Sequence, residues 1–296
     1  MNKPNTFRLA ATVCLLAIAP LATATEGGGG SYQNGIENYM GGALPPPGLY
    51  FLGYAASTSA DTLRDGAGNR VPISFHADAS IVAPRVVWVG EQRLLGGNPV
   101  LHGIFPVVDL SVEVNGQRQR KSGLGDVTLG AGVSYHASQA FHYVVALNLN
   151  APTGRFEKTD IANIGRNYWT AQPMFAASYV QAVGVNADVK VMYDVNRRNS
   201  ETNYRSGREL HMDYALGWGV ANGWVLGVGG YLYRQVSDDD LPGGTVAGRG
   251  KAAAWGPSIK YDNGKGMFIT AKWQQEYSVA SRAEGTAFMI KATLPF

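Results

Sequence analysis

The sequence predicts an all-β fold: a transmembrane, antiparallel, up-and-down β-barrel of about 12 strands. Three observations predict it. Strand-like runs with an apolar residue at every second position follow one another from residue 49 to the end. The connections between these runs alternate between long and short. The last run ends on an aromatic residue, Phe296, which suits a strand that must pair with the first strand so that no edge remains.

The amino-terminal residues 1–24 predict a secretory signal peptide. Lys3 and Arg8 form a positive start, and 9–21 form a short apolar stretch. Residues 22–24 match the small-x-small pattern that precedes a cleavage site. A membrane anchor is the alternative, but the apolar stretch is short and the flank after it is rich in glycine. We therefore expect the chain to be exported and cleaved.

The composition restricts the class of protein further. The chain has 296 residues, 16% of them charged, which permits one large β domain. Its net charge of +3 is small, so no nucleic-acid partner is indicated. The only cysteine, Cys14, lies in the predicted signal peptide. Disulfides and thiolate chemistry are therefore excluded from the predicted mature chain.

Residues 25–48 do not resemble a strand, and they form the second predicted region. Their two ends, 27–30 and 45–48, are rich in glycine and proline and favour flexible and extended backbone. Two interpretations stay open. Composition favours a disordered periplasmic lead-in. The alternative is a plug that folds back into the lumen, with its candidate residues between the two ends: Glu37, Asn38 and Tyr39.

The third region, 49–296, contains the predicted barrel. The expected strands are 49–57, 74–90, 98–114, 123–137, 141–151, 167–182, 185–197, 209–221, 224–236, 250–261, 266–277 and 285–296. An even number of strands with alternating connections is typical of outer-membrane barrels, which have short periplasmic turns and longer outer loops. Both ends of the chain are then expected in the periplasm.

The predicted connections fall into two classes. The expected long loops are 57–72, 113–122, 152–166, 196–208, 237–249 and 278–284. The expected short turns are 91–97, 137–140, 183–184, 222–223 and 262–265. Asn-Gly pairs at 222–223 and 263–264 supply the positive φ angles of tight hairpins. Pro106 is expected to interrupt the third strand, because proline has no backbone N–H for the ladder.

The faces of the predicted strands differ in polarity. In the run from 185 to 196, valines, alanine and tyrosine alternate with asparagine, aspartate, lysine and methionine. One face of such a strand suits lipid and the other suits water, whereas a soluble sandwich would bury the apolar face in a core. The residues expected to face the lumen are Asp126, Thr128, Asp188, Lys190, Asp194, His211, Asp213, Lys272, Glu276 and Lys291. They either line a path for a small molecule or pair with one another to fill the barrel.

The carboxyl-terminal strand is expected to carry the signal for membrane assembly. Its apolar face contains Phe288, Ile290, Leu294 and Phe296. The opposite face, with Met289, Lys291 and Thr293, is expected at the seam with the strand that begins near Leu49. The expected partners are accordingly outer-membrane lipid and the barrel-assembly machinery, and the expected location is the bacterial outer membrane.

Several stretches resemble the proteins named for the meta-cleavage pathway of phenol degradation, a family of outer-membrane β-barrels. The matching stretches are Glu-Asn-Tyr at 37–39, Leu-Pro-Pro-Pro-Gly-Leu-Tyr at 44–50, Gly-Leu-Gly-Asp at 123–126, Pro-Thr-Gly at 152–154, Asn-Ile-Gly at 163–165, Tyr-Trp at 168–169, Lys-Trp-Gln-Gln-Glu at 272–276 and Leu-Pro-Phe at 294–296. The resemblance implies uptake of small hydrophobic or aromatic compounds across the outer membrane. It implies no catalytic residues.

An alternative function, an outer-membrane lipid hydrolase, is suggested by His76, Asp78 and Ser80 on one strand face. Residues two apart on a strand lie about 6.5–7 Å apart, which is beyond hydrogen-bond reach unless the side chains lean together. We therefore expect a polar lumen stripe and no enzyme. A third alternative is a structural or adhesive barrel that binds a partner through the loop 238–248.

No cofactor or metal site is predicted. The acidic run 238–240 lacks the spacing of a calcium loop, so an exposed acidic loop is expected there. His136 and His142 flank a predicted turn, but two histidines without a third ligand are weak support for a metal.

Overall fold

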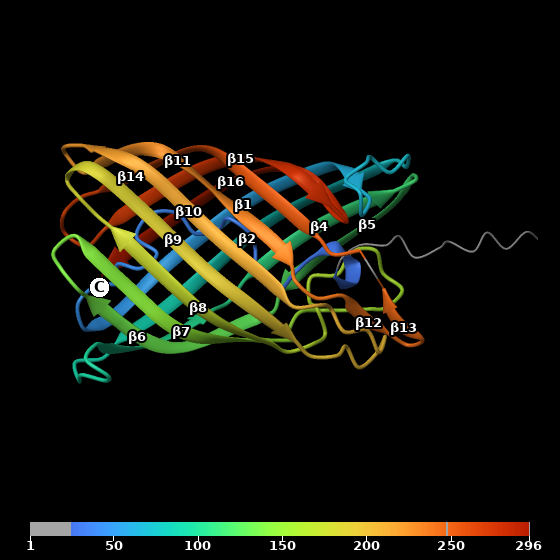
Figure 1. The fold of residues 1–296 in the computed structure, drawn as a ribbon, viewed down its shortest axis with the longest axis horizontal. Helices are drawn as coiled ribbons and strands as arrows, with labels where there is room; N and C mark the ends of the chain where they lie inside the picture. Colours follow the sequence, from blue (N-terminus) through green and yellow to red (C-terminus); the bar gives the residue numbers. More distant parts are fainter. Residues whose placement is uncertain (1–24, 247, 296) are drawn as a thin grey trace, which may run out of the picture.

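The computed structural model describes residues 25–246 and 248–295. Fourteen strands form one antiparallel sheet that closes on itself. Closure occurs at β1 (Gly48–Arg64), which pairs with both β2 (Phe75–Val89) and β16 (Arg282–Pro295). The result is an elongated barrel with tilted strands (Figure 1). The predicted signal peptide and Phe296 lie outside the described residues.

The remaining strands follow in chain order. They are β3 (Asn98–Ile104), β4 (Val107–Val114), β5 (Gln117–Leu124), β6 (Val127–His136), β7 (Phe141–Ala151), β8 (Thr170–Tyr179), β9 (Val183–Asn196), β10 (Glu209–Val220), β11 (Trp224–Gln235), β14 (Lys251–Asp262) and β15 (Phe268–Ala280). A separate hairpin, β12 (Asp239–Leu241) and β13 (Gly244–Val246), lies in a loop, and Glu26–Gly28 form the 3-10 helix η1. Within the described ranges, no helix has the length and apolarity to cross a membrane.

Two wall strands are interrupted partway, so the fourteen strands build a twelve-stranded wall, as the sequence predicts. The break between β3 and β4 is at Phe105 and Pro106, where the carbonyl of Pro106 accepts a hydrogen bond from Gly125 N at 2.8 Å. The facing break lies between β5 and β6, at Gly125 and Asp126. β2 continues past both breaks and pairs with β3 at one end and β4 at the other.

Four of the five expected tight turns are confirmed, whereas the turn expected at 183–184 lies at 180–182, because β9 already begins at Val183. Three of the expected long loops are shortened or replaced by strand. Asn222 and Gly223 have φ angles of 52° and 81° and connect β10 to β11. The expected loop 57–72 begins only after Arg64, and the expected loop 278–284 contains strand on both sides of Ser281. In place of the expected loop 113–122, β4 and β5 form a hairpin around Asn115 and Gly116, whose φ angles are 50° and 81°.

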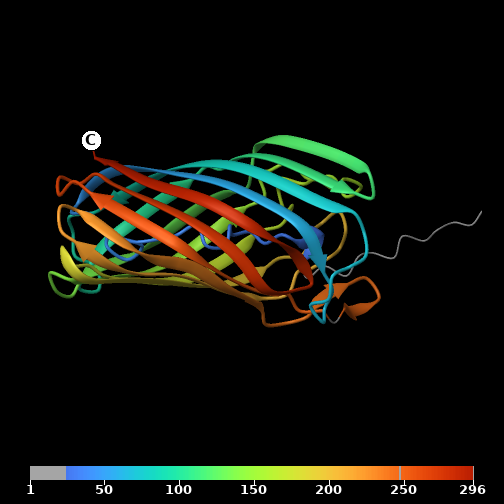
Figure 2. The same cartoon turned by 90° about the horizontal axis from the view of Figure 1, so that it is seen from above.

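The reason for these errors is the loss of the apolar alternation at this end of the barrel. Most side chains of β5 are exposed, and its sequence is Gln-Arg-Gln-Arg-Lys-Ser-Gly-Leu. Where both faces of a hairpin meet water, a strand has no apolar face to distinguish it from a loop. In Figure 2 the hairpin forms a projecting edge of the wall, where β4 stays paired with β2. β5 ends the strand order of the described sheet, so it pairs with β4 alone.

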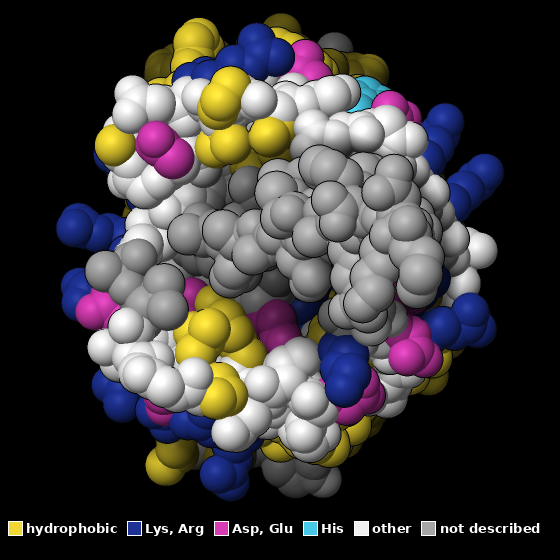
Figure 3. Space-filling model, turned by 90° about the vertical axis from the view of Figure 1, so that its right-hand side faces the viewer, with side chains coloured by type: hydrophobic (Ala, Val, Ile, Leu, Met, Phe, Trp, Pro, Cys, Tyr) yellow, Lys and Arg dark blue, Asp and Glu magenta, His cyan; other side chains and the backbone are white. Residues whose placement is uncertain are grey.

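The two faces of the wall have the predicted polarity. The exposed outer face carries large apolar side chains such as Val82, Trp88, Leu216, Trp218 and Phe288. Inward positions are buried and largely polar, and they include asparagines, glutamines and most of the predicted lumen charges. Viewed onto the end with the long loops, lysine and arginine side chains project around the rim (Figure 3).

Candidate functional site: the lumen and its inner segment

Residues 25–47, here called the inner segment, lie inside the barrel. Their trace runs between the walls in both ribbon views (Figures 1 and 2). Asn34, Glu37, Asn38 and Tyr39 are buried. Composition favoured a disordered lead-in for this region, whereas the structure shows it held by hydrogen bonds to wall strands on several sides.

Glu37 forms the centre of these contacts. One carboxylate oxygen, Oε2, accepts a hydrogen bond from Lys291 Nζ at 2.8 Å, and the other accepts one from the Tyr54 hydroxyl at 2.8 Å. Arg85 and Lys190 lie 3.7 and 3.8 Å from the same carboxylate. Burial alone would raise the pKa of Glu37, but Lys291, Lys190 and Arg85 together lower the pKa well below its usual range. Glu37 is therefore held as an anion among three cations.

The backbone of the inner segment is hydrogen-bonded to charged side chains of the wall. Asp213 accepts hydrogen bonds from the backbone N–H groups of Gly35 and Glu37, at 2.9 and 3.0 Å. Asp188 accepts one from Gly41 N at 2.9 Å. Lys272 Nζ donates to the carbonyl of Glu37 at 2.8 Å. Wall carboxylates thus bind N–H groups and a wall ammonium binds a carbonyl, which satisfies polar backbone that would otherwise be buried unpaired.

Tyr39 occupies a space that glycines in the wall leave free. Its side chain is 1% exposed, and its hydroxyl accepts a hydrogen bond from Ser258 Oγ at 3.1 Å. A Cβ atom at Gly217 would overlap this hydroxyl. Beside it, Asn38 donates through Nδ2 to the carbonyl of Ala271 at 3.4 Å. The plug candidates read from the sequence therefore contact β10, β14 and β15.

The predicted lumen residues divide into groups. Asp188, Lys190, Asp213, Lys272 and Lys291 surround the inner segment. His211 also contacts the segment, since its Nδ1 lies 2.7 Å from Asn34 Oδ1. The other predicted lumen residues make their contacts with the wall and its loops. Asp126 accepts hydrogen bonds from Gly154 N and Arg166 N, at 2.9 and 2.8 Å, and Thr128 donates one to Asn150. Glu276 accepts hydrogen bonds from the Tyr231 hydroxyl and from Gly285 N. Asp194 and His211 lie together with Glu209.

Sequence reasoning missed Tyr54 and Arg85, which complete the surroundings of Glu37. Arg85 Nη1 lies 3.0 Å from the Tyr54 hydroxyl and donates to it. Tyr54 pairs with Ala83 and Leu52 pairs with Arg85 on the neighbouring strands β1 and β2. Since residues two apart on a strand share a face, Tyr54 and Arg85 both face inward. A charged residue inside an otherwise apolar stretch, Ile81 to Val89, was the signal that could have identified Arg85.

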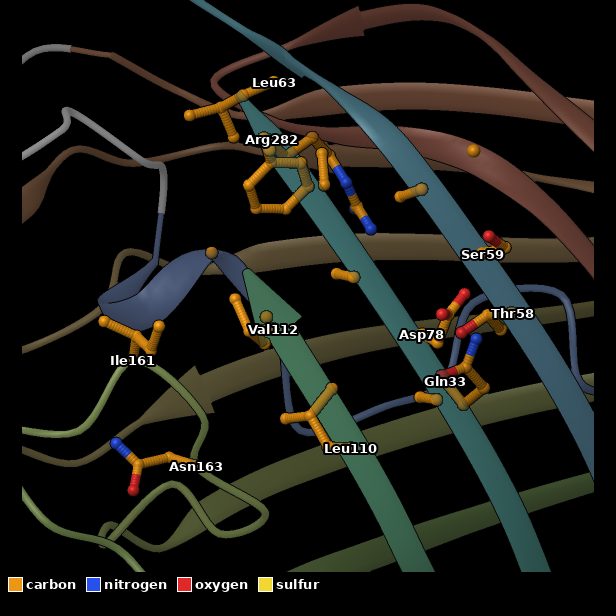
Figure 4. A pocket seen from close by; sticks show the side chains of 18 of the residues that line it. Gln33, Thr58, Ser59, Leu63, Asp78, Leu110, Val112, Ile161, Asn163 and Arg282 are labelled. Atoms are coloured by element: carbon orange, nitrogen blue, oxygen red, sulfur yellow. The ribbon is translucent and has the colours of Figure 1, made fainter. Parts of the chain in front are cut away.

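Two adjoining cavities lie between the inner segment and the wall formed by β1, β2 and β4. The outer cavity has a volume of about 490 Å³ and opens among Leu63, Leu110, Val112 and Ile161 (Figure 4). The second cavity, here called the apolar cavity because its lining includes Ile36, Ile81, Ile104 and Val108, has a volume of about 300 Å³. Residues that line both, including Gln33, Ala79, Leu110, Asn163 and Arg166, mark their junction. A further space of about 40 Å³ shares Tyr32, Glu37 and Lys190 with the apolar cavity.

The hydrolase candidates do not form a lumen stripe. His76, Asp78 and Ser80 are on the same face of β2 as Val82 and Trp88, whose side chains are exposed on the outside. His76 Nε2 and Asp78 Oδ2 do lean together, to 2.8 Å, with both side chains about half exposed. Asp78 lines the outer cavity, whereas His76 and Ser80 are not part of its lining. The expectation of a polar lumen stripe is therefore corrected, since the register turns this face outward.

The acidic run 238–240 is also not a free acidic loop. Asp238 pairs with Arg249 at 2.8 Å, and Asp240 pairs with Arg198 and Arg205. Asp239 is buried and accepts a hydrogen bond from Gly207 N at 2.7 Å. These contacts fold the loop onto its neighbours. At the opposite end of the barrel, the exposed rings of His136 and His142 approach through their Nδ1 atoms to 2.8 Å.

Comparison with known proteins gives one family and several similar folds. The family described as "Putative MetA-pathway of phenol degradation" matches residues 60–292. The COG4313 outer membrane channel from Pseudomonas putida F1 superimposes with a TM-score of 0.76 and 17% identity, over 86% of this chain and 97% of that one. The translocator domain of the autotransporter NalP from Neisseria meningitidis has a TM-score of 0.49 and 12% identity, over 86% and 91%. No curated protein sequence matches. The fold is therefore that of an outer-membrane β-barrel.

Proposed function

The chain belongs to this phenol-degradation family of outer-membrane barrels, and we propose that it is a channel for the uptake of small hydrophobic or aromatic compounds. The observation that carries the proposal is the apolar cavity inside a barrel whose inward positions are largely polar. Its walls include Ile36, Ile81, Ile104, Val108 and Ile164. An apolar cavity that opens to a water-filled lumen contributes nothing to the stability of the barrel while it is empty. Its apolar lining therefore favours an apolar ligand.

The size of the cavity agrees with a monocyclic aromatic compound. An apolar cavity of about 150 Å³ holds benzene, and this one has about 300 Å³. A few polar groups face it, among them Asp126, Arg166 and Lys190. A phenolic hydroxyl has hydrogen-bond partners there, whereas an unsubstituted alkane uses only the apolar wall.

Passage beyond the apolar cavity requires movement of the inner segment. Tyr32 and Glu37 separate the cavity from the smaller space beside Arg85 and His102. Since Glu37 is tied to Lys291 and Tyr54, we propose that the inner segment is a plug whose release opens the route. Deletion of 25–47 should then raise single-channel conductance, and unchanged conductance would contradict this part of the proposal.

The uptake proposal is tested with a matched pair of substitutions on β2. Ala79→Phe places a ring at the junction of the two cavities, whereas Ser80→Phe places the same ring on the outer face. Uptake of labelled phenol is measured in cells that express each variant at equal barrel levels. We expect Ala79→Phe to approach the rate of cells without the protein and Ser80→Phe to resemble the unmodified chain. Equal uptake with and without the protein would refute the proposal.

We propose no enzymatic activity and no adhesive role. The side chains of His76 and Asp78 are about half exposed, and of the three candidates only Asp78 lines the outer cavity, so no shared pocket holds them. If the barrel nevertheless hydrolyses lipid, Ser80→Ala abolishes the release of fatty acid. If it is an adhesin, removal of 238–248 abolishes attachment while uptake persists. The expected partners remain outer-membrane lipid along the exposed apolar face and the machinery that inserts barrels.

A further inference from the structure

Three buried side chains on β9 and β10 converge on one point of the inner wall: Asp194, Glu209 and His211. One ligand-type atom of each, Asp194 Oδ2, Glu209 Oε2 and His211 Nε2, lies within 4.8 Å of the others. All three residues are 0% exposed. None of these three atoms has a hydrogen-bond partner among the described residues. The cluster was not part of the function proposed above, and its test has a separate readout.

The register of the sheet makes this arrangement unfavourable without a cation. Glu209 and Asp194 are directly opposite each other on neighbouring antiparallel strands. Like charges in that position destabilise a sheet, and burial of two carboxylates increases the cost. A positive group between their inner oxygens would remove this cost. The choice is between a protonated His211 and a metal ion.

The outer atoms of the three side chains are each held by an amide. Gln172 Nε2 donates to Asp194 Oδ1 at 2.8 Å, and Asn196 Nδ2 donates to Glu209 Oε1 at 3.4 Å. His211 Nδ1 lies 2.7 Å from Asn34 Oδ1, so Nδ1 carries a proton and donates it to this oxygen. Metal-binding histidines are oriented in this way, with one nitrogen hydrogen-bonded and the other directed at the metal.

The two distances from His211 Nε2 suit a shared metal ion better than a charge-assisted hydrogen bond. His211 Nε2 lies 3.4 Å from Asp194 Oδ2 and 3.3 Å from Glu209 Oε2. A charge-assisted N–H···O bond is about 2.7–2.9 Å long, so neither contact has that length. Two ligands that each lie about 2.0–2.1 Å from zinc at a tetrahedral angle are about 3.4 Å apart. One imidazole nitrogen with two carboxylate oxygens is also a donor set that zinc accepts.

We propose that Asp194, Glu209 and His211 bind one divalent transition-metal ion, with Zn²⁺ as the best fit, through their three converging atoms. The fourth position is left to water. The inner segment takes part from outside this set of ligands. Asn34 orients His211, and a Cβ atom at Gly30 would lie 2.8 Å from Glu209 Oε2, so the segment passes directly over the site. The ion therefore also fastens the first part of the inner segment to β10.

The test begins with the metal content of full-length protein without a histidine tag. Protein is stripped with a chelator, incubated with Zn²⁺, separated from free ion and analysed by mass spectrometry. We expect about one zinc ion per chain, lost in His211→Gln and in Asp194→Asn. His102→Gln is the matched control, because His102 is a buried inward histidine on β3 that bonds Asn148 and not this cluster. It should retain the ion.

Two further variants make the outcome decisive. Replacement of both His136 and His142 by Gln removes the exposed histidine pair and should leave the content unchanged. Asn34→Ala keeps all three ligands and should weaken zinc binding by about 10–100-fold in a competition titration. Heat-modifiable mobility on gels confirms that each variant is a folded barrel. Equal zinc in the unmodified chain and folded His211→Gln, or no zinc in either, would overturn the proposal and leave a protonated histidine in the cluster.

Discussion

Substitution of Glu37 by glutamine is the sharpest perturbation of the inner segment. The change keeps the size of the side chain and an oxygen that accepts the Tyr54 hydrogen bond, but it removes the negative charge. Lys291, Lys190 and Arg85 then lose the carboxylate that they share. We expect the docked position of the inner segment to become less favourable, because buried cations are left unpaired.

The size of the effect follows from the burial of the pair. Removal of one partner from a buried ion pair costs about 3–5 kcal/mol. The Lys291 and Glu37 side chains are 2% and 6% exposed, so solvent screens little of their interaction. Glutamine retains part of the hydrogen bonding, which places the expected cost near 3 kcal/mol. At 1.4 kcal/mol for each factor of ten, the ratio of released to docked segment rises about 100-fold.

Single-channel recording in planar bilayers measures this ratio as the fraction of time in a high-conductance state. Glu91→Gln is the matched control, since Glu91 is exposed in the turn between β2 and β3. The double variant Glu37→Gln with Lys291→Met removes one of the unpaired cations and should return the open fraction toward that of the unmodified chain. An open fraction in Glu37→Gln that equals that of Glu91→Gln would refute the role assigned to Glu37.

Three other predictions concern the same segment and the assembly of the barrel. Docking lowers the pKa of Glu37, so the contribution of its charge to docking is present above the undocked pKa of about 4.3 and is lost as the pH falls toward the docked pKa. Conductance should therefore be constant from pH 8 to about pH 5 and rise below about pH 4.3. A flat pH profile identical to that of Glu37→Gln would contradict this prediction. Tyr39→Ala should raise the open fraction by more than tenfold, because truncation of a buried aromatic side chain costs about 3–5 kcal/mol. Recording with Tyr277→Ala provides the comparison, because the Tyr277 side chain is 45% exposed. Deletion of Phe296 should lower the amount of folded barrel in the outer membrane, as measured by heat-modifiable mobility, and normal levels would refute its role as an assembly signal.

The sequence predicted the features that depend on local patterns. Twelve wall strands follow from period-two alternation, and the turn at Asn222 and Gly223 follows from the φ angles that this pair favours. Closure of β16 on β1 is confirmed by a register that pairs Met289 with Ala56 and Lys291 with Tyr54. The inward position of these two residues of β16 is likewise confirmed by their burial.

Features that depend on register and on distant contacts were not predictable in the same way. Glu209 and Asp194 are opposite each other only because β9 and β10 pair in one particular register, and a shift by one residue would separate them. Glu37 and Lys291 are 254 positions apart in the chain. The polar β4–β5 hairpin lacks the alternation on which strand prediction depends. Composition likewise gave no indication that a glycine-rich segment would be held by wall charges.

The lumen charges had two interpretations: they line a path for a small molecule, or they pair with one another to fill the barrel. The contacts of the inner segment connect these two interpretations. The central wall cations Lys190, Lys272 and Lys291 meet the carboxylate or the carbonyl of Glu37, and do not pair only with carboxylates of the wall. Asp213 likewise meets backbone N–H groups of the segment. If the segment leaves, these wall charges lose their partners, and water must replace them because an unpaired charge in a dry site is costly. Pairing and passage are then two states of one set of residues: the charges fill the barrel while the segment is docked, and they line a hydrated path once it is released.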